Sequence, residues 1–156
     1  MSAWAEALAY WPGAVWLQRS YVAYLAVNAL HILGLGLLIG AILPLDLALL
    51  GAIRAPLAAL APLLARAAAV GFAVALASGL WLFSVKPGEY LANPAFLWKL
   101  GLLGLALANV AAQHAGAGWR ALATGGGPTP RVKAHAALSA LLWLAVLLAG
   151  RWIGFL

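Results

Sequence analysis

The side chains best placed to do chemistry are a histidine and a lysine that stand inside apolar stretches of the sequence. His31 lies within residues 21–43, and Lys99 lies within residues 94–112. Polar side chains at membrane depth are costly and are commonly functional. Histidine is an axial ligand of haem iron, and a lysine ammonium group can hold a haem propionate or another anion. We therefore predict a haem b pocket with His31 as the iron ligand and Lys99 beside it.

Small and polar residues surround His31 in the sequence. Asn28 precedes it by about one helical turn, and Gly34 follows it by about one turn. Small residues would let a flat macrocycle approach a helix, so Asn28 and Gly34 are predicted to border the cofactor. An alternative stays open, because glycines also mark places where membrane helices pack closely. In that reading His31 only hydrogen-bonds a neighbouring helix and Lys99 extends toward the interface.

The other two histidines form a separate candidate metal pair. His114 ends the third apolar stretch and His135 begins the fourth, at a depth about 15–20 Å from His31. The second axial position of a haem would therefore be Lys99, water or His31 of a second copy. His114 and His135 together are candidate ligands for copper, which accepts imidazole.

The sequence contains no recognisable catalytic motif, and no catalytic residue is predicted. The chain has only three acidic residues and no cysteine, which leaves neither paired carboxylates nor a thiol nucleophile. Glycine-rich phosphate loops, nucleophile elbows and zinc-protease helices are also missing from the sequence. Asp46 is expected at the membrane interface, paired with Arg54.

The composition identifies an integral membrane protein. Of the 156 residues, 67% are hydrophobic and 8% are charged, against about 45–50% and about 25% in soluble domains. Soluble, disordered and disulfide-stapled classes are thereby excluded. The net charge of +6 comes from scattered loop residues, so nucleic acid is not an expected partner.

The predicted architecture is an all-α, four-helix transmembrane bundle with a short interfacial N-terminal helix. Residues 1–20 form an amphipathic leader, with a helix over 3–10 that ends near Pro12 and Gly13, and residues 21–156 form the transmembrane domain. The spans are predicted at about 21–43, 67–85, 94–112 and 134–150, each close to the length a bilayer requires. The first two helices are expected to extend into residues 44–66 and to turn near residues 51–56.

The distribution of basic residues predicts that both termini face the periplasm of a bacterial inner membrane. Excess lysine and arginine marks the cytoplasmic side of a membrane protein. The loops after the first and third spans carry Arg54, Arg66, Arg120, Arg131 and Lys133. The opposite side carries Arg19, Lys86 and Arg151, with Lys99 just inside a helix.

Several motifs resemble an uncharacterised family of small bacterial four-helix inner-membrane proteins. They are the run from Leu30 to Gly51, Gly71-Phe72 with the segment from Ser78 to Phe83, and the segment from Asn93 to Leu100. More remotely, a histidine in the first helix and a lysine early in the third resemble HemJ-type protoporphyrinogen oxidases and CopD-type copper-resistance membrane proteins. In HemJ-type proteins such a pair is tied to haem binding, and the resemblance implies a cofactor pocket at His31 and Lys99.

These observations lead to one functional hypothesis and two alternatives. The first is a small b-haem-binding or redox-associated membrane subunit, an electron-transfer component that exchanges electrons with a quinone or a periplasmic or membrane protein. The second is a non-enzymatic scaffold or accessory subunit of a membrane complex. The third is a copper or small-solute permease. In each case the lipid bilayer is a partner, and the chain is expected to form a homo-oligomer or to join a complex.

Overall fold

The computed structural model describes residues 3–155, and within that range the chain is helical with no strand. Four helices are long and apolar enough to cross a membrane. They are α3 (Tyr21–Leu50), α4 (Leu57–Phe83), α6 (Pro94–Ala115) and α8 (Pro130–Trp152), which continues into the short 3-10 helix η1 (Ile153–Phe155). The predicted all-α four-helix architecture is confirmed, and the protein is a multi-pass membrane protein.

Local sequence signals set the ends of these helices. Ser20 caps α3 by accepting a hydrogen bond from Ala23 N at 3.2 Å, and Asn93 caps α6 by accepting one from Ala95 N at 2.9 Å. Gly51 ends α3 in the left-handed conformation, with φ of 86°. The predicted turn near residues 51–56 is therefore confirmed, and α3 and α4 run well beyond the apolar stretches in the sequence.

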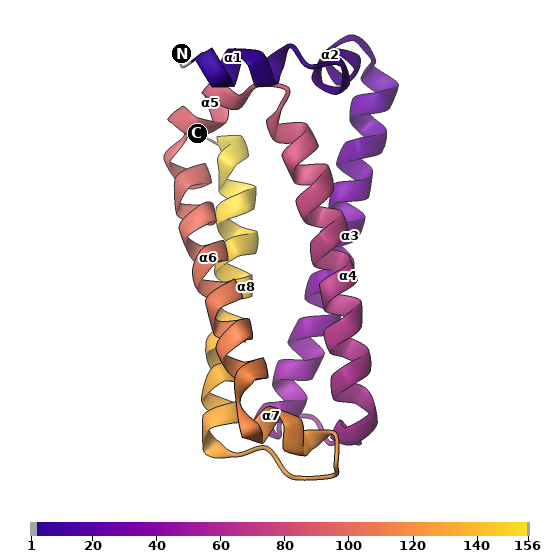
Figure 1. Ribbon diagram of the computed structural model, residues 1–156, viewed down its shortest axis with the longest axis vertical. Helices are drawn as coiled ribbons and strands as arrows, with labels where there is room; N and C mark the ends of the chain where they lie inside the picture. Colours follow the sequence, from indigo (N-terminus) through magenta and orange to yellow (C-terminus); the bar gives the residue numbers. More distant parts are fainter. Residues whose placement is uncertain (1–2, 156) are drawn as a thin grey trace.

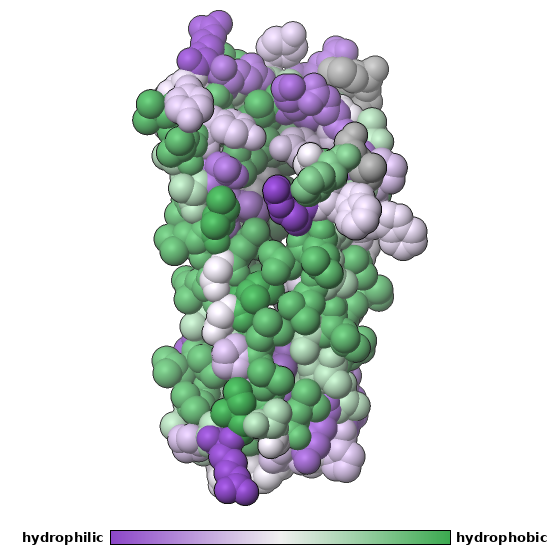
Figure 2. All heavy atoms as spheres, turned by 180° about the vertical axis from the view of Figure 1, so that it is seen from behind, coloured by the Kyte–Doolittle hydropathy of each residue, from purple (hydrophilic) through white to green (hydrophobic). Residues whose placement is uncertain are grey.

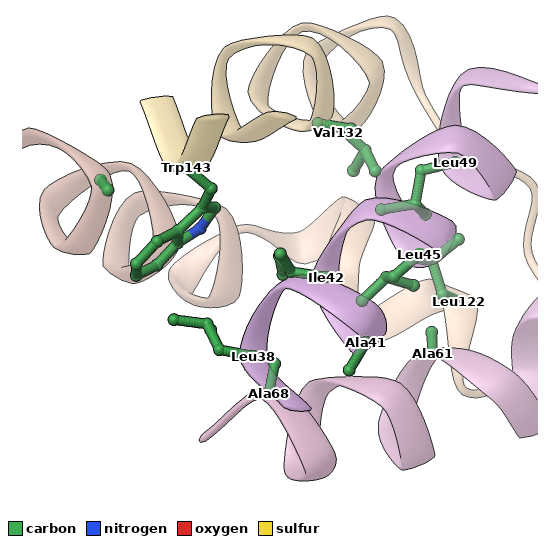
Figure 3. Close-up of a cluster of buried hydrophobic side chains, with 12 residues drawn as sticks. Leu38, Ala41, Ile42, Leu45, Leu49, Ala61, Ala68, Leu122, Val132 and Trp143 are labelled. Atoms are coloured by element: carbon green, nitrogen blue, oxygen red, sulfur yellow. The ribbon is translucent and has the colours of Figure 1, made fainter. Parts of the chain in front are cut away.

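The spanning helices form two antiparallel pairs. Helix α3 packs along α4, and α6 packs along α8 (Figure 1). The pairs are joined mainly by contacts between α3 and α8. The larger buried cluster lies in the half of the bundle farther from the termini, where Leu38, Ile42 and Leu45 of α3 meet Val132 and Trp143 of α8 (Figure 3).

Short helices close the two ends of the bundle. Helices α1 (Ala3–Ala9) and α2 (Pro12–Arg19) lie across the end that also holds α5 (Pro87–Ala92), while α7 (Ala117–Leu122) lies at the other end (Figure 1). Trp11 Nε1 donates to Ser84 Oγ at 3.0 Å, and Trp81 Nε1 donates to Gly13 O at 3.0 Å. The leader is thus docked on the end of α4.

The predicted leader helix is confirmed as α1, which ends at Ala9, but a second leader helix that was not predicted follows it. Pro12 begins α2, because proline lacks the N–H that a first helical turn leaves unpaired anyway.

The surface matches a lipid environment. Figure 2 shows a broad apolar belt between two more polar ends on the face it displays. Large apolar side chains are well exposed along the spans, among them Leu33 at 66% and Leu148 at 67%. Such continuous apolar exposure is untypical of soluble monomers and is expected of helices that face lipid.

Candidate functional site

The imidazole of His31 is fixed by α4 through one of its two ring nitrogens. His31 Nδ1 lies 2.8 Å from Ala75 O and 3.2 Å from Ser78 Oγ. A carbonyl oxygen only accepts, so Nδ1 must carry the proton and donate. The Ser78 hydroxyl donates to Val74 O at 2.6 Å, which leaves its oxygen free to accept from His31. In the neutral imidazole Nε2 then carries the lone pair, and none of the hydrogen bonds found in residues 3–155 engages it.

Glycines bring α4 close enough to hold this ring. A Cβ on Gly79 would lie 2.9 Å from His31 Cε1, so only glycine leaves room for the imidazole there. A Cβ on Gly34 would lie 2.6 Å from Ala75 N, and one on Gly71 would lie 2.5 Å from Leu38 N. Gly34 is thus buried in the contact between α3 and α4, where it lets α4 approach His31.

Lys99 lies on the other helix pair and points toward the same region. Its half-buried side chain runs along α8 at Gly150, where an added Cβ would meet Lys99 Cε and Nζ at 3.5 and 3.6 Å. The ammonium group is near enough to His31 to disfavour a positive charge on the imidazole. Asn28, also predicted for the site, is exposed on α3 one turn before His31. The structure therefore brings His31 and Lys99 into one region from separate helix pairs.

An aromatic cluster stands between this region and the end of the bundle that holds the termini. The rings of Phe83 and Phe96 stack with centroids 5.4 Å apart and planes 2° apart, and Tyr90 contacts both. Burial is the main cause that raises the pKa of Tyr90, with smaller contributions from Tyr24 and then Glu89. Sequence reasoning missed this cluster.

The cluster did leave a signal in the sequence. Phe83 follows Gly79 by four residues, and Phe96 precedes Lys99 by three. Both spacings place an aromatic ring one helical turn from a candidate site residue.

His114 and His135 form hydrogen bonds with different partners. His114 Nδ1 donates to Val110 O of its own helix at 2.8 Å, and its ring lies 4.3 Å from that of Trp119. His135 Nδ1 donates to Asn109 Oδ1 at 2.7 Å, and Asn109 Nδ2 donates back to His135 O at 3.0 Å. Within the described chain, no group of three or more histidine, cysteine or acidic residues is arranged to hold a metal ion.

Asp46 is buried inside the bundle, and the expected pair with Arg54 was wrong. The side chain is 1% exposed, whereas Arg54 is exposed in the turn after α3. Lys86 with Glu89 is the one ion pair that residues 3–155 contain. The periodicity of α3 explains the error, because residue 46 falls on the face that α8 covers and α3 continues past Pro44.

No protein-family model, curated protein or solved structure matches this chain.

Proposed function

We propose that this protein is a small b-haem-binding, redox-associated membrane subunit with His31 Nε2 as an axial ligand. The observation that supports this most is the tautomer of His31. Metal-ligating histidines characteristically donate their other ring N–H to a carbonyl or carboxylate, which orients the ring and makes the free nitrogen more basic. His31 has this arrangement, with Nδ1 on Ala75 O and Nε2 unengaged.

Other residues fit the same cofactor. Lys99 supplies a positive charge that would hold a propionate, and its approach from α6 would place the haem between the two helix pairs. Phe83 and Phe96 offer an apolar aromatic wall one turn away. A bound haem would supply one-electron chemistry, while the protein would fix the ligand and exclude water. The second axial position would fall to water or to His31 of a second copy.

Hemin titration of the full-length protein in detergent tests this proposal. We expect a saturable shift of the Soret band with the wild type and its loss in His31→Ala. His135→Ala is the matched control, because it removes a half-buried histidine elsewhere and should titrate like the wild type. Gly79→Ala should weaken binding while keeping the ligand, since its Cβ would push against the ring. If His31→Ala binds hemin like the wild type, the proposal is wrong. If the protein is instead a non-enzymatic scaffold, His31→Ala should lower the thermal stability and leave the absorption spectrum unchanged.

We further propose that the end carrying the termini faces the periplasm of a bacterial inner membrane. Both termini lie at one end of the bundle (Figure 1). Toward the other end lie five basic residues, Arg54 in the turn after α3 and Arg66, Arg120, Arg131 and Lys133 in the helices there. The chain has no cysteine, so single-cysteine variants can be labelled cleanly. An impermeant maleimide should label Lys86→Cys in intact cells and label Lys133→Cys only after lysis. The reverse pattern would refute the orientation.

A further inference from the structure

Three buried polar atoms make no hydrogen bond within 3.5 Å, and they face one region between α3 and α8, where Ser139 lies beside Asp46. They are Asp46 Oδ2, Ser139 Oγ and Trp143 Nε1. Their residues are 1%, 3% and 3% exposed. Ser139 and Trp143 are one helical turn apart on α8, so their side chains lie on the same face. Even one buried polar group without a hydrogen bond is unusual in a folded protein. Three such groups around one space indicate that a bound molecule or water forms hydrogen bonds with them.

These residues line a cavity of about 180 Å³. The rest of its wall is mainly apolar and comes from α3, α4, α6 and α7, including Leu38, Phe72 and Leu107. Gln113 and His114 add polar groups at the α6 side. Ala69 of α4 and Leu107 of α6 line the cavity and are also exposed. The cavity therefore opens sideways between α4 and α6, on a surface that faces lipid. A ligand would reach it most directly from the bilayer.

The three polar groups define which ligand chemistry fits. Trp143 Nε1 can only donate, an ionised Asp46 can only accept, and the Ser139 hydroxyl can do both. An ammonium ligand supplies donors only and would leave Trp143 unpaired. A carboxylate ligand supplies acceptors only and would face Asp46. A neutral molecule with carbonyl or hydroxyl oxygens can satisfy all three groups.

The size and walls of the cavity narrow the class further. An apolar cavity of about 150 Å³ accommodates a benzene ring, so this one has room for a single substituted ring. Phe72 and Trp143, whose own rings lie 6.2 Å apart edge to face, provide aromatic surface for it. Quinones and quinols combine such a ring with carbonyl or hydroxyl oxygens and dissolve in the bilayer.

We propose that this cavity binds the head group of a quinone or quinol from the membrane. Trp143 and Ser139 donate to ring oxygens, and Asp46 holds the hydroxyl of the reduced form. The site is separate from His31, and the proposal holds whether or not haem binds there.

Calorimetric titration of the full-length protein with decylubiquinone and with its quinol tests the proposal. We expect saturable binding of one molecule per chain. Trp143→Phe and Ser139→Ala should each weaken it by about 3- to 10-fold, the usual effect of one lost hydrogen bond. Trp98→Phe is the matched control, because Trp98 is 72% exposed and lies outside the cavity wall. Asp46→Asn should weaken quinol binding more than quinone binding, with Glu89→Gln as its control.

The outcomes are distinguishable. Ser139→Ala removes one unpartnered hydroxyl and should fold normally, so the test stands even if Trp143→Phe does not fold. His31→Ala should bind the quinol like the wild type, which separates this site from the haem proposal. Binding of benzylamine that depends on Asp46, without quinol binding, would show a cation site and overturn the inference. The inference would also be overturned if neither the quinone nor the quinol binds, or if none of the cavity variants weakens their binding. Water would then be the occupant of the cavity.

Discussion

Replacing Gly71 with alanine tests the contact that holds α3 against α4. The new Cβ would lie 2.5 Å from Leu38 N and 2.8 Å from Gly34 O, both of them backbone atoms that cannot rotate away. Ordinary contact begins near 3.4 Å, so the helices would have to separate by about 0.9 Å at this point. Overpacking of this kind costs about 1–3 kcal/mol of the free energy of unfolding.

The same movement should weaken the candidate site. Ala75 follows Gly71 by one turn on α4, and its carbonyl accepts from His31 Nδ1 at 2.8 Å. A separation of about 0.9 Å would stretch this distance to about 3.7 Å, beyond the range of a hydrogen bond. We therefore expect Gly71→Ala to bind hemin more weakly although every candidate ligand is still present.

Thermal unfolding and hemin titration of the purified variant measure both effects. Gly40→Ala is the matched control, because a Cβ there meets nothing within 4 Å. It should unfold at or above the wild-type temperature, since alanine is the better helix former, and it should bind hemin normally. If Gly71→Ala matches Gly40→Ala in both measurements, the close contact does not position His31.

Three further predictions concern the end of the bundle where α1, α2 and α5 lie. Trp11→Phe removes the hydrogen bond to Ser84 and should weaken the docking of α1 and α2 on α4 by about 0.5–1.5 kcal/mol. Trypsin should then cleave after Arg19 faster than in the wild type. An unchanged cleavage rate would show that this hydrogen bond does not hold the leader in place. Asn93→Ala removes the side-chain cap of α6 and should destabilise the protein by about 1 kcal/mol in thermal unfolding, and no loss would contradict this role. Burial raises the pKa of Tyr90, so the unfolded chain loses this proton first and stability should fall as the pH rises above about 10. Tyr90→Phe should reduce that alkaline loss of unfolding temperature, and an equal loss in both proteins would refute the assignment.

The sequence predicts the architecture well because lipid imposes simple rules. An apolar stretch of about 20 residues without charges must be a helix, since the bilayer core offers no other partner to the backbone. The turn at Gly51 could also be predicted, because glycine readily adopts the left-handed conformation that ends a helix. The second leader helix could not, because Pro12 and Gly13 fit a helix end as well as a helix start, and docking of Trp11 and Trp81 decides between them.

The candidate site was predictable only in part. The intramembrane positions of His31 and Lys99 indicated a shared region, but the sequence could not show which nitrogen of the imidazole is engaged. Gly34 illustrates the difficulty, because a glycine beside a cofactor and a glycine between helices have the same spacing, and only the partner helix distinguishes them. The burial of Asp46, and with it the lack of a pair with Arg54, could not be predicted because it depends on the rotation of α3 against α8, which hydropathy alone does not encode.

Helix α3 connects the two proposed sites. His31, Leu38 and Ile42 follow one another at intervals of seven and four residues, so they share one face of the helix. Leu38 and Ile42 line the cavity that contains Asp46, which therefore begins about 10 Å along the helix axis from His31. The neighbouring face carries Gly34 and packs tightly on α4, which fixes the rotation of α3 and so the direction of both polar side chains. The closely packed α3–α4 pair would thus hold one polar group for each of the two proposed sites, and a ligand from the bilayer would enter between this pair and the α6–α8 pair.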